Sequence, residues 1–135
     1  MENKPEENED VAITLANEAG GDGYMAMIAV ACVIANRCRA RNQTAYDVVH
    51  APKQFSCWTE LTPEQRQKNY LAVKEDADKI AAELFSHYDI THGAQNYLTN
   101  KLYNSIDCPG WAYDMVVTVV IVNQTFLKPA GAMDA

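Results

Sequence analysis

The sequence predicts one α+β domain that is mainly helical and carries a small C-terminal β-hairpin. The chain has 135 residues, of which 48% are hydrophobic, and this suits a single domain with a real core. Apolar residues recur at helical spacing up to about residue 86, whereas β-branched runs come only after residue 92. Helices that precede strands, rather than alternate with them, are typical of the α+β class.

Composition and pattern divide the chain into three expected regions. Residues 1–10 hold five acidic side chains and one lysine, which predicts a disordered acidic leader. Residues 11–128 contain the expected helices and strands and form the folded domain. Residues 129–135 are expected to be a flexible tail.

Two helices are expected in the first third of the domain. The first covers about 10–19 and ends at the glycines 20 and 21. The second covers about 24–39 and is apolar nearly all round. A helix with that pattern is expected at the centre of the core.

Capping residues mark two further helices. Thr44 can cap a short helix over 45–50, and Pro52 follows its end. The segment Thr62–Gln65 supplies an N-cap threonine, a proline at the first helical position and a glutamine two residues later. A long helix is therefore expected from there to about Ser86.

The late β-branched runs predict two strands. They cover Met115–Val122 and Gln124–Leu127 and are expected to pair as a hairpin through Val122 and Asn123. The turn lacks the glycine that two-residue hairpin turns favour.

Charge and hydropathy exclude several classes of partner. The net charge is −7, and residues 1–10 contribute −4 of it. No basic patch is present to follow phosphates, so nucleic-acid binding is not expected. The short cluster Arg37, Arg39 and Arg41 is expected to complement the dipole at a helix end. The sequence contains no run of eighteen apolar residues, so membrane insertion is not expected. The acidic N-terminus does not resemble a signal peptide.

Four cysteines give little support to a metal site. Cys32, Cys38, Cys57 and Cys108 form no C-x-x-C pair, so neither a metal nor an organic cofactor is expected. Without an export signal, reduced thiols are favoured. A disulfide among the last three is left open.

Glu18 is the leading candidate for catalysis. It shares one face of the first expected helix with Val11 and Leu15, and that face should point inward. The negative end of the helix dipole and partial burial would both raise the pKa of its carboxyl. A carboxyl that stays protonated near neutral pH suits a general acid. The alternative is an ordinary surface carboxylate in the last turn.

Polar and aromatic residues in the expected loops suit a sugar-binding groove. Flat rings stack on pyranose faces, while amides and hydroxyls bind sugar hydroxyls and N-acetyl groups. The candidates are Gln54, Phe55, Ser56, Trp58, Tyr97 and Thr99. For Trp58, and for Trp111 further along, a partly buried anchor of a loop is an equal alternative.

The order of several segments resembles the cell-wall hydrolase family of the spore-cortex lytic enzymes. The segments are Leu15–Ala19, Ile28–Arg37, Tyr46–Val49, Gln54–Cys57, Gly93–Tyr97 and Val117–Phe126. The resemblance spans about residues 11–128. It departs from the family pattern at Asn17, where a glycine is usual, at Asp22, where a second Gly-Glu is common, and at Val122–Gln124, where Gly-Asn-His is common.

The resemblance implies a lysozyme-like catalytic domain that cleaves the MurNAc–GlcNAc β-1,4 bond of peptidoglycan, with Glu18 as the acid. It also implies that Gln54, Phe55, Ser56 and Tyr97 line the groove. Hydrolytic glycosidases usually need two carboxylates, and Asp22 and Asp47 are the candidates for a second. A lytic transglycosylase needs only one, because the 6-hydroxyl of muramic acid replaces water; this route is favoured over hydrolysis.

Two other classes stay open at this point. A cysteine-dependent amidase or peptidase would use Cys57 with His50, His87 or His92 as the base. A non-catalytic glycan-binding module would use the same groove with Glu18 as an acceptor. For the favoured glycan-cleaving enzyme the expected partner is the glycan strand of peptidoglycan, and the protein is expected to be a monomer. Because the wall lies outside the cytoplasm, a phage lysis enzyme or virion component is the expected context.

Overall fold

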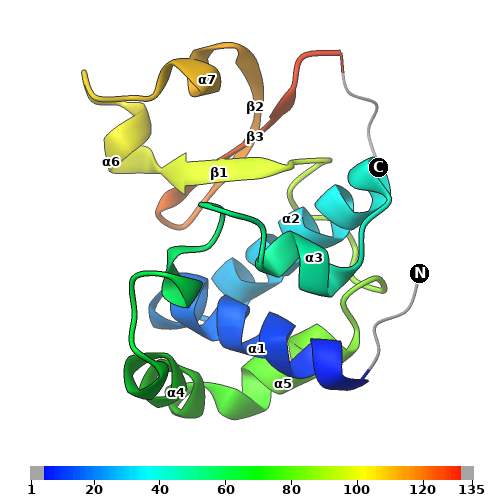
Figure 1. Cartoon of the computed structure of the whole chain (residues 1–135). Helices are drawn as coiled ribbons and strands as arrows, with labels where there is room; N and C mark the ends of the chain where they lie inside the picture. The colour runs from blue at the N-terminus through cyan, green and yellow to red at the C-terminus, as the bar shows by residue number, and fades with distance from the viewer. Residues whose placement is uncertain (1–4, 132–135) are drawn as a thin grey trace.

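The computed structural model describes residues 5–131 as a helical layer beneath a small sheet (Figure 1). The helical layer is made of α1 (Pro5–Ala19), α2 (Tyr24–Arg41), α3 (Ala45–Val49), α4 (Pro63–Ala72) and α5 (Lys74–Ala82). The sheet is made of β1 (Asn96–Thr99), β2 (Met115–Ile121) and β3 (Gln124–Pro129). Short elements complete the fold: η1 (Gly20–Asp22), η2 (Ser56–Trp58), α6 (Asn100–Tyr103) and α7 (Gly110–Tyr113). The predicted α+β class is confirmed.

Helix α1 is the hub of the helical layer. It packs against α2, α3, α4 and α5, and the side chains of Val11 and Leu15 on its inner face are fully buried. The helix begins at Pro5, about five residues earlier than predicted, so residues 5–10 are helical and not part of a leader. A proline followed by acidic residues is a favourable helix start. Residues 1–4 of the predicted leader lie outside the described residues, as do residues 132–135 of the predicted tail.

Helix α2 is the central helix, as predicted. Its small and branched side chains pack on two sides at once. One side joins the core of the helical layer, and the other places Ala29 and Val33 against Ala94 and Phe126 beneath the sheet. The helix therefore connects the two layers. Within residues 5–131 no helix combines the length and the apolar character that crossing a bilayer requires.

The expected long helix from Thr62 to about Ser86 is wrong in one respect, because it is broken at Val73. The capping box at its start forms as predicted. The Val73 backbone N–H bonds to the carbonyl three residues back, and α5 then starts in a new direction along α1. Val73 packs tightly on the turn after α1, where a Cβ on Gly20 would lie 3.0 Å from its Cγ2. We therefore attribute the interruption between α4 and α5 to tertiary packing of Val73, since no glycine or proline lies there.

The sheet is antiparallel with the strand order β1-β3-β2. The predicted hairpin of β2 and β3 is confirmed, and β1 adds a third strand that the pattern had not predicted. Tyr97 on β1 pairs with Phe126 on β3, and their rings lie 5.5 Å apart. An irregularity between Val117 and Val119 interrupts the register of β2 with β3.

The hairpin turn holds a valine in a left-handed conformation. Val122 has φ 52°, which is rare for a β-branched residue. Its neighbours fix the turn from two sides. Asn100 donates from its backbone N–H to the Asn123 carbonyl at 2.8 Å and from its side chain to the Val122 carbonyl at 3.3 Å. Asn123 donates from its side chain to Asp22 on η1 at 3.1 Å. The tip is therefore held although its backbone is strained.

Replacing Val122 with glycine should stabilise the protein. The left-handed region costs an L-residue about 1–2 kcal/mol, and glycine avoids this cost. We expect the free energy of unfolding in urea to rise by about 1 kcal/mol. Val120→Gly is the matched control, since Val120 is also exposed but lies within β2, and it should lower stability. Equal losses of unfolding free energy in Val122→Gly and Val120→Gly would contradict the conclusion that the turn at Val122 is strained.

Candidate active site

Glu18 lies in the last turn of α1, where the helical layer meets the sheet. Its side chain is half-buried. The hydroxyl of Tyr97 on β1 donates a hydrogen bond of 2.9 Å to Glu18 Oε1. This contact joins residues 79 positions apart in the chain and brings together the two leading sequence candidates. Because Tyr97 occupies Oε1, the other oxygen is the one available to carry an exchangeable proton.

The environment of Glu18 keeps its carboxyl protonated to higher pH than usual. Burial raises the pKa of Glu18, and this effect outweighs the Tyr97 hydrogen bond and the charge of Arg37, which both lower it. The predicted direction of the pKa shift is confirmed. Burial also raises the pKa of Tyr97 well above its usual value, so the phenol stays a hydrogen-bond donor. Both groups of the pair therefore keep their protons to higher pH than the same groups would in water.

A second polar cluster positions β1 and, through it, Tyr97. The Asp89 carboxylate accepts from the Thr91 N–H at 2.9 Å and hydroxyl at 2.6 Å, and from the Gly93 N–H at 2.8 Å. It also accepts from the Asn36 side chain of α2 at 2.9 Å, which in turn donates to the Ala94 carbonyl. These bonds fix the turn at His92 and Gly93, whose φ angles are 54° and 87°. The turn therefore enters β1 in one orientation.

Arg37 is the residue of this region that the sequence interpretation missed. It was expected to complement the dipole of α2 at the surface, but only 4% of it is exposed. Its Nε donates to the Gln95 carbonyl at 2.5 Å, and its guanidinium lies 5.3 Å from the centre of the Phe55 ring. Its position inside an otherwise apolar helix face, one residue after Asn36, is the signal that marks it as buried.

The segment Gln54–Trp58 alternates between exposed and inward-facing side chains. Gln54 and Ser56 are exposed, whereas Phe55 and Cys57 are buried, with Phe55 only 3% exposed. The Phe55 ring therefore supports the segment from within and offers no free face to a sugar. Gln54 and Ser56 are left as the residues accessible to a ligand.

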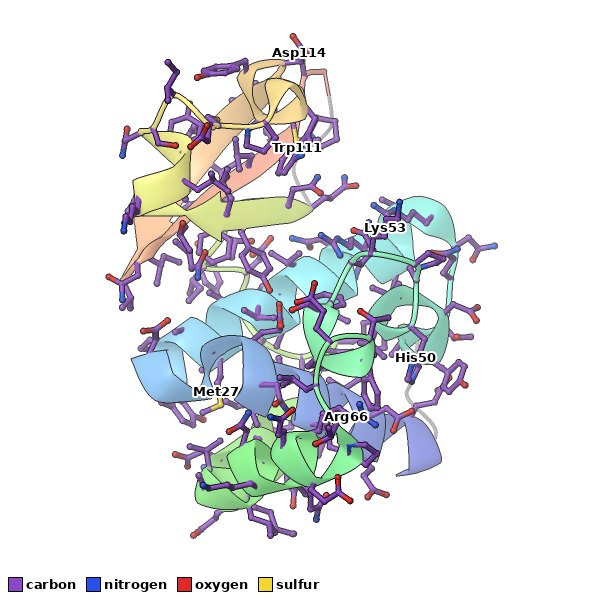
Figure 2. All side chains as sticks on the ribbon, turned by 60° about the vertical axis from the view of Figure 1, so that its left-hand side comes forward. Met27, His50, Lys53, Arg66, Trp111 and Asp114 are labelled. Carbon is purple, nitrogen blue, oxygen red and sulfur yellow. The ribbon has the colours of Figure 1, made fainter. Side chains whose placement is uncertain are left out.

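Trp58 fastens this segment to α1 one turn before Glu18. Its indole N–H donates to the Thr14 hydroxyl at 3.0 Å, and its ring lies 4.4 Å from that of His50 and 5.0 Å from the Arg66 guanidinium. Figure 2 labels His50 and Arg66 in the helical layer of the molecule. Of the two interpretations of Trp58, these contacts fit the loop anchor. Trp111, by contrast, is 45% exposed on the sheet side of the molecule (Figure 2).

The remaining candidates have structural partners. The Thr99 hydroxyl caps α6 by accepting from the Leu102 N–H at 3.1 Å, although the residue is exposed. Of the candidates for a second carboxylate, Asp22 accepts from Asn123, and Asp47 lies exposed in the first turn of α3. Neither shares the hydrogen bond that joins Glu18 to Tyr97.

The cysteines do not resemble catalytic thiols. All four are free and buried. Burial, followed by the charge of Glu18, raises the pKa of Cys57 to about 12, whereas a nucleophilic cysteine needs a lowered pKa. Two histidines that were its possible bases have other partners: His50 contacts Asp10 at 2.8 Å, and His87 contacts the Ile80 carbonyl at 2.9 Å. Over residues 5–131 no three His, Cys, Asp or Glu side chains are grouped as metal ligands would be.

Comparison with known proteins agrees with this geometry. The profile of the Cell Wall Hydrolase family matches residues 21–127. The chain belongs to the cell wall hydrolase family. Two solved structures share its fold, and both are catalytic domains of SleB. The one from Bacillus anthracis, titled a germination-specific lytic transglycosylase, is 22% identical, with a TM-score of 0.72 over 93% of this chain and 96% of that one. The one from Bacillus cereus is also 22% identical, with a TM-score of 0.73 over 93% and 92%.

Two limits of these matches bear on the site of this cell wall hydrolase. No curated protein sequence matches the chain. The family match begins three residues after Glu18, so the role of Glu18 rests on its own geometry: the last turn of α1, partial burial and the bond from Tyr97. Tyr97 and the Gln54–Trp58 segment lie inside the match.

Removing the Tyr97 hydroxyl should change the acidity of Glu18. The hydrogen bond from Tyr97 lowers the pKa of Glu18, so Tyr97→Phe should raise that pKa further. The protonated form of an essential acid then persists to higher pH, and the descending basic limb of the kcat/KM profile on cell walls should move upward. Tyr88→Phe, at an exposed tyrosine, is the control and should leave the limb in place. An unmoved or lowered limb in Tyr97→Phe would contradict the proposed pairing.

Asp89 should stabilise the fold in a pH-dependent way. Burial alone would raise the pKa of Asp89, but the hydrogen bonds from Thr91, Asn36 and Gly93 lower it overall. A carboxylate with a lowered pKa contributes stability above its unfolded pKa, about 4, and loses it as the pH falls through the folded value.

We therefore expect Asp89→Asn to lose about 2 kcal/mol of unfolding free energy at pH 7, since hydrogen bonds to a charged acceptor are lost. The difference from wild type should shrink in acid. Urea unfolding at neutral pH and at about pH 3 measures both effects. Asp114→Asn, at an exposed position on the sheet side (Figure 2), is the control and should change little. A difference that stays constant with pH would refute the charged-acceptor role.

Proposed function

We propose that this cell wall hydrolase cleaves peptidoglycan glycan strands at the MurNAc–GlcNAc β-1,4 bond, with Glu18 as the acid and base. The observation that carries the proposal is the half-buried Glu18 carboxyl, whose pKa is raised by burial and which accepts a hydrogen bond from the Tyr97 hydroxyl at 2.9 Å. Family membership and the fold shared with SleB support the same substrate class.

The chemistry of the first step follows from the protonation state of Glu18. Its proton passes to the glycosidic oxygen as the bond from that oxygen to the muramic acid C1 breaks, and the released GlcNAc keeps the new hydroxyl. Glu18 is then a carboxylate next to an electron-poor C1. Tyr97 stabilises that carboxylate, because a hydrogen bond to the charged form is stronger than one to the neutral form.

The second step distinguishes transglycosylation from hydrolysis. In transglycosylation the 6-hydroxyl of the same muramic acid attacks C1 and gives its proton to Glu18, which leaves a 1,6-anhydro end and regenerates the acid. No water is consumed and no second carboxylate is needed. We favour this route because both candidates for a second carboxylate have structural roles: Asp22 accepts from Asn123, and Asp47 lies in the first turn of α3. Hydrolysis by a muramidase mechanism is the alternative.

The accessible groups near Glu18 suit the binding of sugars. Gln54 and Ser56 are exposed and carry the amide and hydroxyl that N-acetyl sugars require. Tyr97 can accept a hydrogen bond while it donates to Glu18, and Thr99 lies two residues further along, at the end of β1. Phe55 and Trp58 support this wall from behind rather than stacking on the ligand.

Substituting Glu18 should abolish cleavage without unfolding the protein. Glu18→Gln keeps the shape and the bond from Tyr97 but removes the transferable proton, and loss of a general acid lowers rates by about 100- to 10,000-fold. Turbidity loss of purified cell walls measures the rate. Cys57→Ser should keep most of the activity, which separates glycan cleavage from a cysteine-dependent amidase or peptidase. Lysis retained in Glu18→Gln would reject the proposal, and wall binding without any turbidity loss in the wild type would indicate a non-catalytic module.

Mass spectrometry of digested peptidoglycan identifies the second step. A transglycosylase yields muropeptides with 1,6-anhydro ends, one water lighter than the reducing ends that hydrolysis leaves. We expect the lighter products. Reducing ends that incorporate ¹⁸O from labelled water would instead indicate a muramidase.

The setting in which the enzyme acts stays a prediction. We propose that it acts on the wall as a monomer and is delivered as a phage lysis enzyme or virion component. Fractionation of producing cells and virions, together with light scattering of the purified protein, tests this. A protein that remains in the cytoplasm with neither lysis nor virion association would count against that context.

A further inference from the structure

Arg37 is a buried cation whose charge no carboxylate contacts in the described part of the chain. Its Nε is bonded to the Gln95 carbonyl, and its Nη2 makes a longer contact of 3.5 Å to Asn96 Oδ1. Both partners are neutral. Its Nη1 is buried and has no hydrogen-bond partner among residues 5–131. The ion pairs His50–Asp10 and Lys74–Asp78 do not involve Arg37.

Such an arrangement is costly, because a cation loses its hydration on burial and regains little without a counter-charge. Burial lowers the pKa of Arg37 to about 10, so it still carries its charge near neutral pH. Arg41, one turn further on, adds repulsion. Interactions with Tyr97 and Glu18 act in the opposite direction and raise the pKa of Arg37. The cation therefore acts on the carboxyl of the proposed site without pairing with it.

The position of Arg37 links three segments around Glu18. It extends from α2, holds the start of β1 through Gln95 and Asn96, and covers the Phe55 ring of the segment that carries Gln54 and Ser56. Other charged groups near α1 have different partners. Arg66 of α4 donates to the Cys57 and Leu61 carbonyls, and Asp22 of η1 accepts from Asn123. The groups that act on Glu18 are thus Tyr97 and Arg37, and Glu18 in turn raises the pKa of the Cys57 thiol.

We propose that Arg37 is a positioning residue of this site, a fixed buried charge that holds β1 in place and stabilises Glu18 after it has given up its proton. The proposal rests on the proposed function of Glu18. A direct ion pair would keep Glu18 ionised and useless as an acid. A cation that acts without contact leaves burial as the larger effect on the pKa of Glu18, yet offsets the negative charge that forms during bond cleavage.

The test compares Arg37→Met, which removes the charge, with Arg37→Lys, which keeps it. In Arg37→Met the basic limb of the kcat/KM profile on cell walls should move to higher pH, because the charge that lowers the pKa of Glu18 is lost. The fall in kcat should exceed the change in KM, because the lost interaction is made mainly in the transition state. Arg37→Lys should restore the limb towards its wild-type position.

Arg39→Met is the matched control. Arg39 lies two residues further along α2, donates to the Phe85 carbonyl at 3.1 Å and lies 5.5 Å from the Phe85 ring, but it is exposed. Its loss should leave the limb unchanged. If Arg37→Met does not fold, Arg37→Gln removes the same charge and retains a donor for Gln95.

A second readout separates this proposal from the proposed function. The ¹³C carboxyl signal of Glu18, assigned by its absence in Glu18→Gln, reports the pKa of Glu18 without any substrate. We expect the titration to move to higher pH in Arg37→Met and to return towards wild type in Arg37→Lys. An unchanged titration in Arg37→Met would overturn the role of Arg37 even if glycan cleavage is confirmed. If Arg37→Lys and Arg37→Met lose activity equally and the basic limb of the kcat/KM profile does not move, the role of Arg37 is structural only, and the proposal is likewise overturned.

Discussion

The hydrogen bond from Tyr97 to Glu18 is the constraint on which the site depends. It joins the last turn of the first helix to the first strand of the sheet, so it exists only when both layers are assembled. Neither partner ionises easily, because burial raises the pKa of both. The same contact thus fixes the orientation of the Glu18 carboxyl, and it forms only in the folded protein. An unfolded or partly folded chain has an ordinary glutamate in its place.

The polar residues at the C-terminal half of α2 make this contact possible. Asn36 bonds to Asp89 and to the Ala94 carbonyl, and Arg37 bonds to the Gln95 carbonyl. These bonds attach α2 to the segment that leads into β1. Helix α2 therefore fixes the position of the sheet relative to α1. Burying such groups is unfavourable unless they are bonded, and nearly all of their donors and acceptors are used. The exceptions are Asn36 Oδ1 and Arg37 Nη1, which are buried and have no hydrogen-bond partner among residues 5–131.

Sequence reasoning predicted the elements whose signal is local. The apolar pattern of α2, the cap at Thr62 and the β-branched runs of the hairpin each predicted an element that the structure contains. Glu18 was identified because helical spacing places it on the same face of the first helix as the apolar residues Val11 and Leu15. The break at Val73 was missed because no glycine or proline marks it; its cause is the packing of Val73 on Gly20, far away in sequence. The role of Arg37 was missed for the same reason, since its partners lie 58 and 59 residues away.

Neighbouring residues of the segment Gln54–Trp58 have different roles, because inward-facing and outward-facing side chains alternate along it. Phe55 and Trp58 hold the segment to the helical layer, while Gln54 and Ser56 face outward and are not needed for the core. Changes at the outward positions would alter the rim of the site at little cost in stability. A lineage carrying this scaffold can therefore change the outward positions Gln54 and Ser56 towards walls of different chemistry, while selection on folding acts on Phe55 and Trp58.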